Sequence, residues 1–582
     1  MAKFFSRLSF LLLSILLFLP FAGCGSSGSS GGGGVYSYRT VSGAVRESDG
    51  ATPIANAFVV LNTSGVRSTL TTTANALGVY SFSQVPTGTF RAAFWLSQDD
   101  YEANPDTPLG ALNINTSTGS VTGLNLQDGV LAPWINLVNP TQWESGDNVT
   151  VTGTDFGTAI GTNRVTFDST PVGTFVSWCA TQIICTANTD SASTAQVIVN
   201  DLESNQYQIV NRKWTVMVYL DADNNLASDG VTNMQQMISV GNSDDVDILV
   251  LWDGCASYHQ SALPDGTRLY RITQGAWEQL ANYGELNMGN PQTLVDFVNY
   301  STANYPAQKY MLVFWNHGGG WRAQASKAPL TKNVCWDLTN GDDSLSLPEI
   351  NTALATISGN LGKKIDLVGF DACLMSMLEV GYDMKDSVGM MTASEETEPG
   401  AGWPYDQILT YLIDHPTCTA AQLGTNIVQD YLAYYGTGAG LNYAVLNLDK
   451  TGEIVTLLND LTQKIETSGT DKATVRNIAY SAYYFSDEDF IDLKDFARRL
   501  SVSGDISSQE VKDSAAALNT ALIAGIDNFV VYADYSRVRA SLSDTGGVSI
   551  YFPYGSYSSS YNNINFAQDT DWASFLQYIL GN

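Results

Sequence analysis

From Arg212 onward, short apolar runs alternate with amphipathic stretches of helical period. The apolar runs have the length of buried strands and end in polar or glycine-rich turns. They are KWTVMVYLDADNNL, VDILVLWDG, KYMLVFWNHGGGW, KIDLVGFDACL and VGMMTASEE. Helical stretches such as SDGVTNMQQMISVG and LPEINTALATIS separate them. This alternation predicts an α/β domain over residues 212–582, with a mainly parallel central sheet that helices cover on both faces.

The preceding part of the chain has a different pattern. Between residues 38 and 211, threonine and valine alternate and Gly and Pro recur at short intervals, as in Val149-Thr150-Val151-Thr152. This period of two is typical of half-buried strands joined by tight turns. We therefore expect two small all-β sandwiches, at residues 38–128 and 129–211. A multidomain chain also fits the length of 582 residues, because a single hydrophobic core does not grow to that size.

The N-terminus is predicted to be a targeting segment. Lys3 and Arg7 precede an apolar run of twelve residues, 8–19, which is too short to span a bilayer as a mature helix. The small residues directly before Cys24 resemble a bacterial lipobox, with Phe21 at the position usually held by Leu. A plain secretory signal that is cleaved nearby is the alternative.

We expect residues 1–23 to be a lipoprotein signal peptide and Cys24 to be lipidated. The Gly/Ser-rich residues 24–37 would form a flexible tether. In some bacteria an Asp directly after the lipidated cysteine signals retention at the inner membrane, and Gly25 occupies this position. We therefore expect the protein to be anchored in the bacterial cell envelope, at the outer membrane or cell surface. Release from the envelope is the other possibility. No apolar run in the sequence reaches 18 residues, so the anchor is the only membrane contact that we expect.

Net charge limits the partners that we expect, and cysteine content limits the disulfides and metal sites. The formal net charge of −30 repels nucleic acid phosphates and anionic lipid headgroups, so no nucleic acid partner is expected. Among the seven cysteines, Cys179 and Cys185 lie close together in a β-rich segment, and export permits a disulfide between them. The absence of CxxC spacing and the scatter of the three histidines argue against structural zinc.

Four polar residues mark the ends of the predicted strands: Asp221, His317, Cys373 and Glu395. Ligand sites in parallel α/β sheets lie beyond the carboxyl ends of the strands, so these residues are the candidates for chemistry. His317 and Cys373 follow separate strands and can converge at one sheet edge. Three glycines follow His317, and they let a substrate backbone approach while leaving amides free to donate. An imidazole there can protonate an amine leaving group because it titrates near neutral pH.

The sequence after Cys373 predicts a helix that begins at this residue, since Leu374, Leu378 and Tyr382 recur at helical spacing. The free amides and the dipole at a helix start would favour a thiolate and a developing oxyanion. A lone cysteine at a strand end is nevertheless often buried filler, and a lone histidine is mostly structural. Spacing by itself therefore leaves nucleophile and filler both open.

The sequences NHGGGW and DACLMS resemble the histidine and cysteine motifs of the clostripain family of cysteine peptidases, which belongs with caspases, legumains and gingipains. Further blocks follow in the family order: WTVMVYLDADNNL, CWDLTNGDDSLSLPEI, ASEETEPGAGWPY, DLKDFARRL, SIYFPY and NFAQDTDWASFL. The resemblance implies a caspase-like domain in which His317 and Cys373 form a catalytic dyad and the amides of Gly318 and Cys373 form the oxyanion hole. It implies an acyl-enzyme, no third acid and no cofactor required for the chemistry.

The two β regions resemble known modules as well. VSGAVRESDGATPIANAFVVLN and ALGVYSFSQVPTGTF resemble the carboxypeptidase regulatory-like sandwich, which implies seven strands and a spacer or adhesive role. PWINLVNPTQWESGDNVTVTGTDFG resembles the IPT/TIG immunoglobulin-like fold. Neither region has a constellation typical of catalysis, so we interpret both as a structural stalk.

The clostripain resemblance implies a preference for a basic residue before the scissile bond. The acid two positions before the nucleophile lies near the floor of the S1 pocket in that family, and Asp371 occupies this position. A carboxylate there would pair with Arg or Lys and reject acidic side chains. Capping of a helix that begins at Cys373 is the other role open to Asp371. Further acidic candidates, each with an equal claim to be a solvated loop charge, are Glu395, Glu396, Glu398 and Asp406. The choice between Arg and Lys stays open.

Family members often mature by cutting themselves between the two catalytic motifs. The segment WRAQASKAPLTKNVCW lies in this interval and contains proline and three basic residues. We predict autoproteolysis after Lys327 or Lys332, and an ordinary exposed basic loop is the alternative.

Calcium is linked to clostripain activity, and two acidic clusters offer ligands. The first is Asp221-x-Asp223-x-Asn225, which has Leu226 where a calcium loop needs Gly. The second comprises Asp337, Asp342 and Asp343. The candidate ion is Ca²⁺, and the sequence does not decide which of these two clusters would bind it.

Two functions compete at the level of sequence. The first is a lipid-anchored extracytoplasmic cysteine endopeptidase that acts on protein or peptide substrates after Arg or Lys. The second is a catalytically silent cell-surface lipoprotein that binds partners through its β-sandwiches. The presence of both His317 and Cys373 favours the enzyme, because an inactive relative has no chemical need for both.

Overall fold

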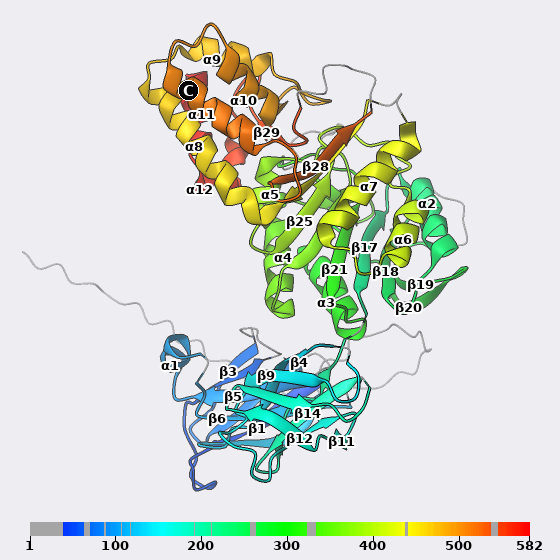
Figure 1. Cartoon of the computed structure of the whole chain (residues 1–582), viewed down its shortest axis with the longest axis vertical. Helices are drawn as coiled ribbons and strands as arrows, with labels where there is room; N and C mark the ends of the chain where they lie inside the picture. The colour runs from blue at the N-terminus through cyan, green and yellow to red at the C-terminus, as the bar shows by residue number, and fades with distance from the viewer. Residues whose placement is uncertain are drawn as a thin grey trace, which may run out of the picture.

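The computed structural model describes most of the chain from Arg39 onward. The described residues are 39–62, 70–85, 89–105, 107–116, 118–141, 143–190, 192–210, 212–255, 263–322, 333–436, 440–536 and 545–581. Cys24 and the predicted signal peptide lie outside them. Within these ranges, no helix is both long and apolar enough to cross a membrane. Two β-sandwiches at one end of the molecule are followed by an α/β domain (Figure 1).

The first sandwich consists of a three-stranded and a four-stranded sheet. Its strands are β1 (Arg39–Arg46), β2 (Phe58–Asn62), β3 (Leu70–Thr73), β4 (Val79–Val85), β5 (Thr89–Trp95), β6 (Gly110–Asn115) and β7 (Val121–Gln127), with the short helix α1 (Gln98–Ala103) after β5. The sheet orders are β4-β1-β7 and β3-β2-β5-β6. Inward-facing residues such as Val45, Val59 and Phe94 form one core between the sheets, as alternating strand patterns require.

The second sandwich also packs two sheets around one core. Its strands are β8 (Trp134–Asn139), β9 (Asn148–Thr154), β10 (Arg164–Phe167), β11 (Thr170–Pro171), β12 (Thr174–Trp178), β13 (Gln182–Thr186), β14 (Thr194–Val199), β15 (Leu202–Glu203) and β16 (Tyr207–Gln208). Val149 and Val151 point into this core, as their alternation with threonine predicts. An ion pair of 2.6 Å between Arg91 and Asp155 joins the two sandwiches.

The predicted bridge between Cys179 and Cys185 is wrong, because both cysteines are free. They belong to one hairpin, in which the amide of Cys179 at the turn donates to the carbonyl of Gln182 at 2.8 Å. Cys185 lies further along β13 opposite Phe175, and its buried thiol donates to the carbonyl oxygen of Val149. Cys179 is exposed at the turn, so the side chains of the two cysteines do not meet.

The α/β domain is built on nine described strands in the order β20-β19-β18-β17-β21-β24-β25-β26-β28. They are β17 (Trp214–Ala222), β18 (Val246–Gly254), β19 (Thr267–Thr273), β20 (Ala276–Gly284), β21 (Lys309–Trp315), β24 (Ile365–Asp371), β25 (Val388–Ala393), β26 (Asn442–Asn447) and β28 (Val530–Tyr535). The five central strands from β18 to β25 run parallel, and two antiparallel strands extend each edge. The predicted class, two all-β sandwiches and a caspase-like α/β domain, is confirmed.

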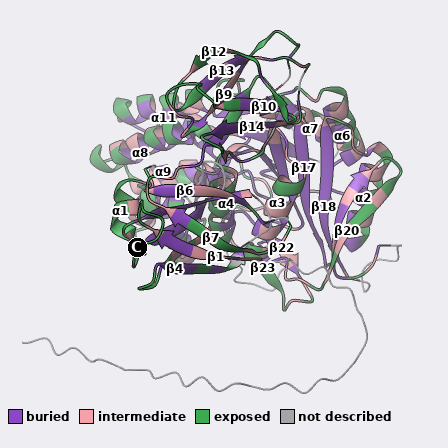
Figure 2. Ribbon diagram, turned by 90° about the horizontal axis from the view of Figure 1, so that it is seen from below, coloured by how far each residue is buried: buried purple, intermediate pink, exposed green. Residues whose placement is uncertain are grey.

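Helices cover both faces of this sheet. One face packs against α3 (Pro291–Asn304), α4 (Leu347–Leu361) and α5 (Leu378–Met384). The other packs against α2 (Ala227–Val240), α6 (Tyr405–Asp414) and α7 (Ala420–Tyr435). Along β17, Met217 and Tyr219 face the first set and Val216 and Val218 face the second. Burial on both faces explains why β17 and β18 are apolar throughout rather than alternating (Figure 2).

The C-terminal part forms a helical lobe beside the sheet (Figure 1). It contains α8 (Thr451–Thr467), α9 (Lys472–Tyr480), α10 (Leu493–Val502), α11 (Gln509–Ala521), α12 (Asn565–Asp569) and α13 (Trp572–Leu580). Two-stranded ribbons pair β22 (Val334–Asp337) with β23 (Asp343–Leu345), and β27 (Phe490–Asp492) with β29 (Ser549–Tyr551).

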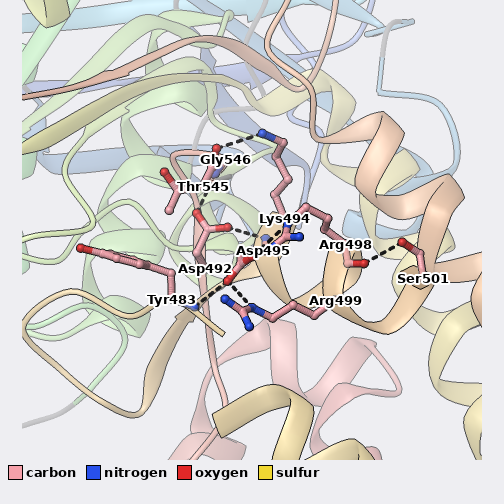
Figure 3. Close-up of polar contacts among 9 residues, drawn as sticks. All are labelled: Tyr483, Asp492, Lys494, Asp495, Arg498, Arg499, Ser501, Thr545 and Gly546. Carbon is pink, nitrogen blue, oxygen red and sulfur yellow. Dashed lines mark hydrogen bonds and ion pairs between the residues drawn. The ribbon is translucent and has the colours of Figure 1, made fainter. Parts of the chain in front are cut away.

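A buried polar cluster fixes the start of α10 (Figure 3). Asp492 caps the helix by accepting from the amide of Asp495 at 2.7 Å, and its other oxygen accepts from the amide of Gly546. The Asp495 carboxylate is nearly inaccessible and takes ion pairs from Arg498 and Arg499. The cluster therefore ties the helical lobe to the backbone near β29.

Candidate active site

Parallel pairing of β21 with β24 brings the predicted histidine and cysteine to the same sheet edge. The register places Trp315 opposite Asp371, and the amide of Asn316 extends the ladder to the carbonyl of Asp371 at 3.2 Å. His317 and Cys373 each lie two residues beyond this pair, after Trp315 and Asp371 respectively. The loops that carry them touch, because a Cβ added to Gly318 would lie 2.4 Å from the carbonyl oxygen of Cys373.

His317 is half-buried at this edge and is held from two sides. Its Nε2 lies 3.0 Å from Oδ1 of Asn225, which belongs to the turn between β17 and α2. Its ring is tilted against that of Trp336, with 5.9 Å between the centroids. The preceding residue is anchored as well, since Asn316 donates from Nδ2 to the buried carboxylate of Asp221 at 2.8 Å.

Cys373 is a shielded thiol in this structure. Its sulfur accepts from the amide of Glu398 at 3.2 Å. Burial raises the pKa of the Cys373 thiol to about 12, and the carboxylates of Glu398 and Glu396 contribute to the rise. The thiol is therefore protonated at neutral pH, and a base must remove its proton before it can act as a nucleophile.

The expectation that a helix begins at Cys373 is wrong. Helix α5 begins at Leu378, and Leu374 has a left-handed backbone with φ of 64°. The amides of Leu374 and Ser376 pair instead with the carbonyls of Glu396 and Ser394, in the loop after β25. A helix dipole consequently does not act on the Cys373 sulfur, and capping of such a helix by Asp371 is excluded.

Asp371 lies two residues before Cys373 and is 5 % exposed. Its carboxylate accepts from the amide of Trp403 at 3.1 Å and from the hydroxyl of Tyr405 at 3.0 Å. Burial raises the pKa of Asp371 to about 7, although these two hydrogen bonds act in the opposite direction. Burial and the Asp371 carboxylate raise the pKa of the adjacent Glu398 well above its usual range. Asp371 and Glu398 are therefore two neighbouring acidic groups behind Cys373.

Glu395 is 2 % exposed and occupies a different environment. Its carboxylate accepts from Nδ2 of Asn442 at 2.7 Å. Burial, together with the nearby Asp492 of the α10 cluster, raises the pKa of Glu395 well above its usual range. The predicted role of Glu395 in substrate binding does not fit this position, because its side chain packs against the helical lobe.

Four carboxylates gather next to the histidine loop. Ligand atoms of Asp223, Asp253, Glu285 and Asp337 lie within 4.8 Å of one another, and three of these residues are buried. Burial raises the pKa of Asp253 to about 9, with Glu285 and Asp337 adding to the shift. Among the described residues, one buried oxygen of Asp223 and one of Asp253 have no hydrogen-bond partner. Orphaned carboxylate oxygens at this spacing fit a hard cation such as Ca²⁺.

The cluster differs from both predicted ligand sets. Asp223 and Asp337 each come from one predicted set, and structure joins them across more than a hundred residues. Asp253 and Glu285 were not predicted, although Asp253 lies at the end of the run VDILVLWDG and the strand-end rule applies to it. Asn225, offered by the sequence as a calcium ligand, contacts His317 instead.

The predicted cleavage positions Lys327 and Lys332 lie outside the described residues. The chain is described up to Arg322, which is anchored. Its guanidinium forms ion pairs with Asp487 and Asp489 and lies 4.7 Å above the centroid of the Phe490 ring. The start of the predicted processing segment is therefore fastened to the helical lobe.

Comparisons with known proteins identify the families of two of the domains. The sequence profile of the clostripain family matches residues 218–579, and that of the IPT/TIG domain matches residues 133–209. Clostripain from Hathewaya histolytica is 26 % identical over 431 residues, which cover 63 % of this chain and 80 % of that protein.

Solved structures with a similar fold include two bacterial enzymes. One is a secreted C11 cysteine protease from Bacteroides thetaiotaomicron, in complex with an irreversible peptide inhibitor. Its sequence is 20 % identical to this chain and its TM-score is 0.47. The match covers 63 % of this chain and 99 % of that chain. An inactive zymogen C11 protease from Parabacteroides distasonis is 16 % identical, with a TM-score of 0.45, covering 62 % of this chain and 98 % of that chain.

Proposed function

The chain belongs to the clostripain family and is a cysteine peptidase, and we propose that it is a lipid-anchored extracytoplasmic endopeptidase that cleaves after Arg or Lys through His317 and Cys373. The observation that carries this proposal is the juxtaposition of the two residues at the ends of adjacent parallel strands. Its substrates are proteins or peptides. The alternative of a catalytically silent surface lipoprotein gains no support from the comparisons.

The shielded thiol determines how the proposed reaction begins. Because Cys373 is protonated at neutral pH, His317 acts as the general base that takes its proton as the sulfur attacks the peptide carbonyl. The amides of Gly318 and Cys373 stabilise the oxyanion. The resulting imidazolium protonates the amine leaving group, and the acyl-enzyme forms. His317 then removes a proton from water, which hydrolyses the thioester and restores the thiol.

A basic preference is supported by the acidic pair behind the nucleophile. A guanidinium or ammonium group in the S1 pocket would stabilise the ionised form of Asp371, whose pKa burial raises to about 7. Glu398, rather than Glu395, is the second acid near that pocket, since its amide contacts the Cys373 sulfur. Charge attraction in a shielded site makes this pair suited to Arg and Lys and hostile to acidic side chains.

The N-terminal part of the proposal concerns location. Lipidation at Cys24, after removal of residues 1–23, would anchor the enzyme in the bacterial envelope on the tether 24–37 and the two sandwiches. The first sandwich would be a carboxypeptidase regulatory-like module, and its seven described strands match that assignment. Both modules would act as a stalk that holds the peptidase away from the membrane.

Maturation is proposed to occur by autoproteolysis after Lys327 or Lys332. Wild-type enzyme should then convert to two fragments under activating conditions, while the Cys373→Ala variant remains intact. An identical intact band for both proteins would contradict this idea.

Calcium is the proposed ion for the four-carboxylate cluster. Asp223, Asp253, Glu285 and Asp337 would hold it through oxygen atoms, which are the ligands that Ca²⁺ prefers. The ion would neutralise carboxylates that repel one another and would fasten the turn after β17 to the loops around Glu285 and Asp337. It would take no part in the bond-breaking steps.

An electrophilic peptide probe with Lys or Arg at its reactive end tests the main proposal. The wild-type protein should be labelled covalently, and the Cys373→Ala and His317→Ala variants should not. A matched probe that carries Glu in place of the basic residue should react far more slowly. Failure of the wild type to react with the basic probes, before and after incubation with Ca²⁺, would reject the proposed activity.

A further inference from the structure

The contact between Asn225 and His317 determines which nitrogen of the imidazole carries the proton, and it involves a residue outside the proposed dyad. Oδ1 of Asn225 lies 3.0 Å from Nε2 of His317, within the distance of an N–H···O hydrogen bond. An amide oxygen only accepts hydrogen bonds, so the Nε2 atom must carry the proton. In a neutral imidazole the other nitrogen, Nδ1, is then the basic one.

The position of Asn225 is fixed by its own turn. The side chain of Asn224 donates to the carbonyls of Asp221 and Trp336, at 3.0 and 3.2 Å, and accepts from the amide of Leu226 at 2.9 Å. Asp221 in turn accepts from Asn316, the residue before the histidine. The turn that carries Asn225 and the loop that carries His317 are therefore fastened to the same residue, since Asn224 and Asn316 both donate to the main-chain carbonyl of Asp221.

We propose that Asn225 is a positioning residue that holds the His317 ring in the tautomer with the proton on Nε2 and directs Nδ1 toward the reacting groups. This inference rests on the proposed function of His317 as general base. The Asn225 oxygen accepts from Nε2 both in the neutral ring and in the imidazolium that forms when the Cys373 proton is taken up. Because a hydrogen bond to a charged donor is the stronger one, the contact tightens as the reaction proceeds.

The same orientation favours the second half of the reaction. If the ring rotated by half a turn about its Cβ–Cγ bond, Nδ1 would exchange places with Cδ2 and Nε2 with Cε1, so the basic nitrogen would turn away and the hydrogen bond to Asn225 would be lost. Asn225 opposes this rotation, as second partners of catalytic histidines do elsewhere. Removal of the amide should thus reduce turnover and leave substrate affinity nearly unchanged.

Steady-state kinetics on a Lys or Arg peptide provides the first measurement. In Asn225→Ala, kcat should fall about 10- to 100-fold, the range expected for a lost hydrogen bond to a charged group. KM should change by less than about threefold, because the amide does not bind substrate. Asn225→Asp keeps an accepting oxygen and should recover most of the lost kcat.

Asn304→Ala is the matched control, since Asn304 is an exposed asparagine whose side chain donates to the carbonyl of Tyr300 within α3 and to no other residue that the structure describes. It should retain wild-type kinetics. An unchanged kcat in Asn225→Ala would overturn the proposal. A kcat in Asn225→Asp that lies below that of Asn225→Ala would also overturn it, because the amide would then be donating to Nε2.

Nuclear magnetic resonance gives a readout that does not depend on activity. The chain has only three histidines, so imidazole nitrogen signals of protein labelled in histidine can be assigned with a His317→Ala variant. The wild type should show the Nε2–H tautomer at His317, and Asn225→Ala should show a mixture of tautomers. A wild-type His317 with its proton on Nδ1 refutes the hydrogen bond.

The two proposals fail in different ways. If the wild type cleaves no peptide and binds no probe, the proposed peptidase specificity fails, and the tautomer measurement still decides whether Asn225 holds the ring. If the wild type is active and Asn225→Ala matches it, only the positioning role fails.

Discussion

The contact between Gly318 and Cys373 gives the sharpest prediction for the active site. Replacement of Gly318 by Ala keeps the backbone amide that we propose as an oxyanion donor and adds one methyl group. The methyl carbon would lie 2.4 Å from the carbonyl oxygen of Cys373 and 3.1 Å from its amide nitrogen. Both neighbours are backbone atoms, so no flexible side chain can move aside.

The size of the effect follows from these distances. Ordinary van der Waals contact begins at 3.4 Å, so the two loops must separate by about 1 Å to admit the methyl group. A misplacement of about 1 Å in an active site costs about 100-fold in rate, which corresponds to about 2.7 kcal/mol of barrier. Cys373 and His317, the proposed nucleophile and base, lie on the two loops that are pushed apart, so kcat/KM should fall by this factor.

The assay is the second-order rate of covalent labelling by the basic peptide probe, together with kcat/KM on a peptide substrate. Gly359→Ala in α4 is the matched control, because a Cβ there meets no atom of the described part of the chain within 4 Å and Ala suits a helix. It should react at the wild-type rate. Thermal unfolding separates loss of geometry from loss of the fold: Gly318→Ala should remain folded at the assay temperature. Wild-type labelling by folded Gly318→Ala would refute the reasoning.

Four further predictions concern specificity, the cation and the anchor. Asp371→Asn should reduce kcat/KM for Lys and Arg substrates about 10- to 100-fold, as expected for a lost charge-assisted hydrogen bond, with little effect on a substrate that has a neutral residue there. Because the pKa of Asp371 is raised to about 7, its carboxyl group is protonated below about pH 7. In the wild type, the ratio of kcat/KM for basic substrates to kcat/KM for neutral substrates should therefore fall as the pH drops through 7. A ratio that does not change with pH would contradict the assignment of Asp371 to specificity. Removal of Ca²⁺ with a chelator should lower the Tm of the wild type, and Asp253→Asn should reduce that response; equal Tm values with and without chelator would argue against a bound ion. Cys24→Ser should move the protein from the membrane fraction to the soluble fraction of the producing cells, and unchanged partitioning would rule out lipid anchoring at this residue.

Local pattern was sufficient to predict the strands and the order of the domains. A run such as WTVMVYL is apolar at every position, which suits only a strand buried on both faces, and β17 is indeed covered by helices on both sides. The strand-end rule then selected His317 and Cys373 before any contact was known. Parallel neighbours have one fixed register, so residues that follow two adjacent strands necessarily meet at the same edge.

The errors at the site arose where distant segments compete with local preference. Leu374, Leu378 and Tyr382 have helical spacing, yet Leu374 and Ser376 pair with the loop after β25, and α5 begins later. The backbone after Cys373 is satisfied by hydrogen bonds to the loop after β25 rather than by those of a helix. The spacing of apolar residues after Cys373 carries no information about that loop. The free cysteines of the second sandwich have a similar origin, because the hairpin register directs the Cys185 thiol into the core.

The sequence by itself determined the layered α/β architecture, the two β modules and the two residues proposed for catalysis, because hydrophobic period and motif order are local properties. Only the tertiary structure decided what surrounds those residues. The pairing of Asp371 with Glu398, the contact of Asn225 with His317, and the cluster of Asp223, Asp253, Glu285 and Asp337 depend on loops far apart in the chain. The fold brings these loops to one edge of the sheet, and their burial and mutual charges set their chemistry.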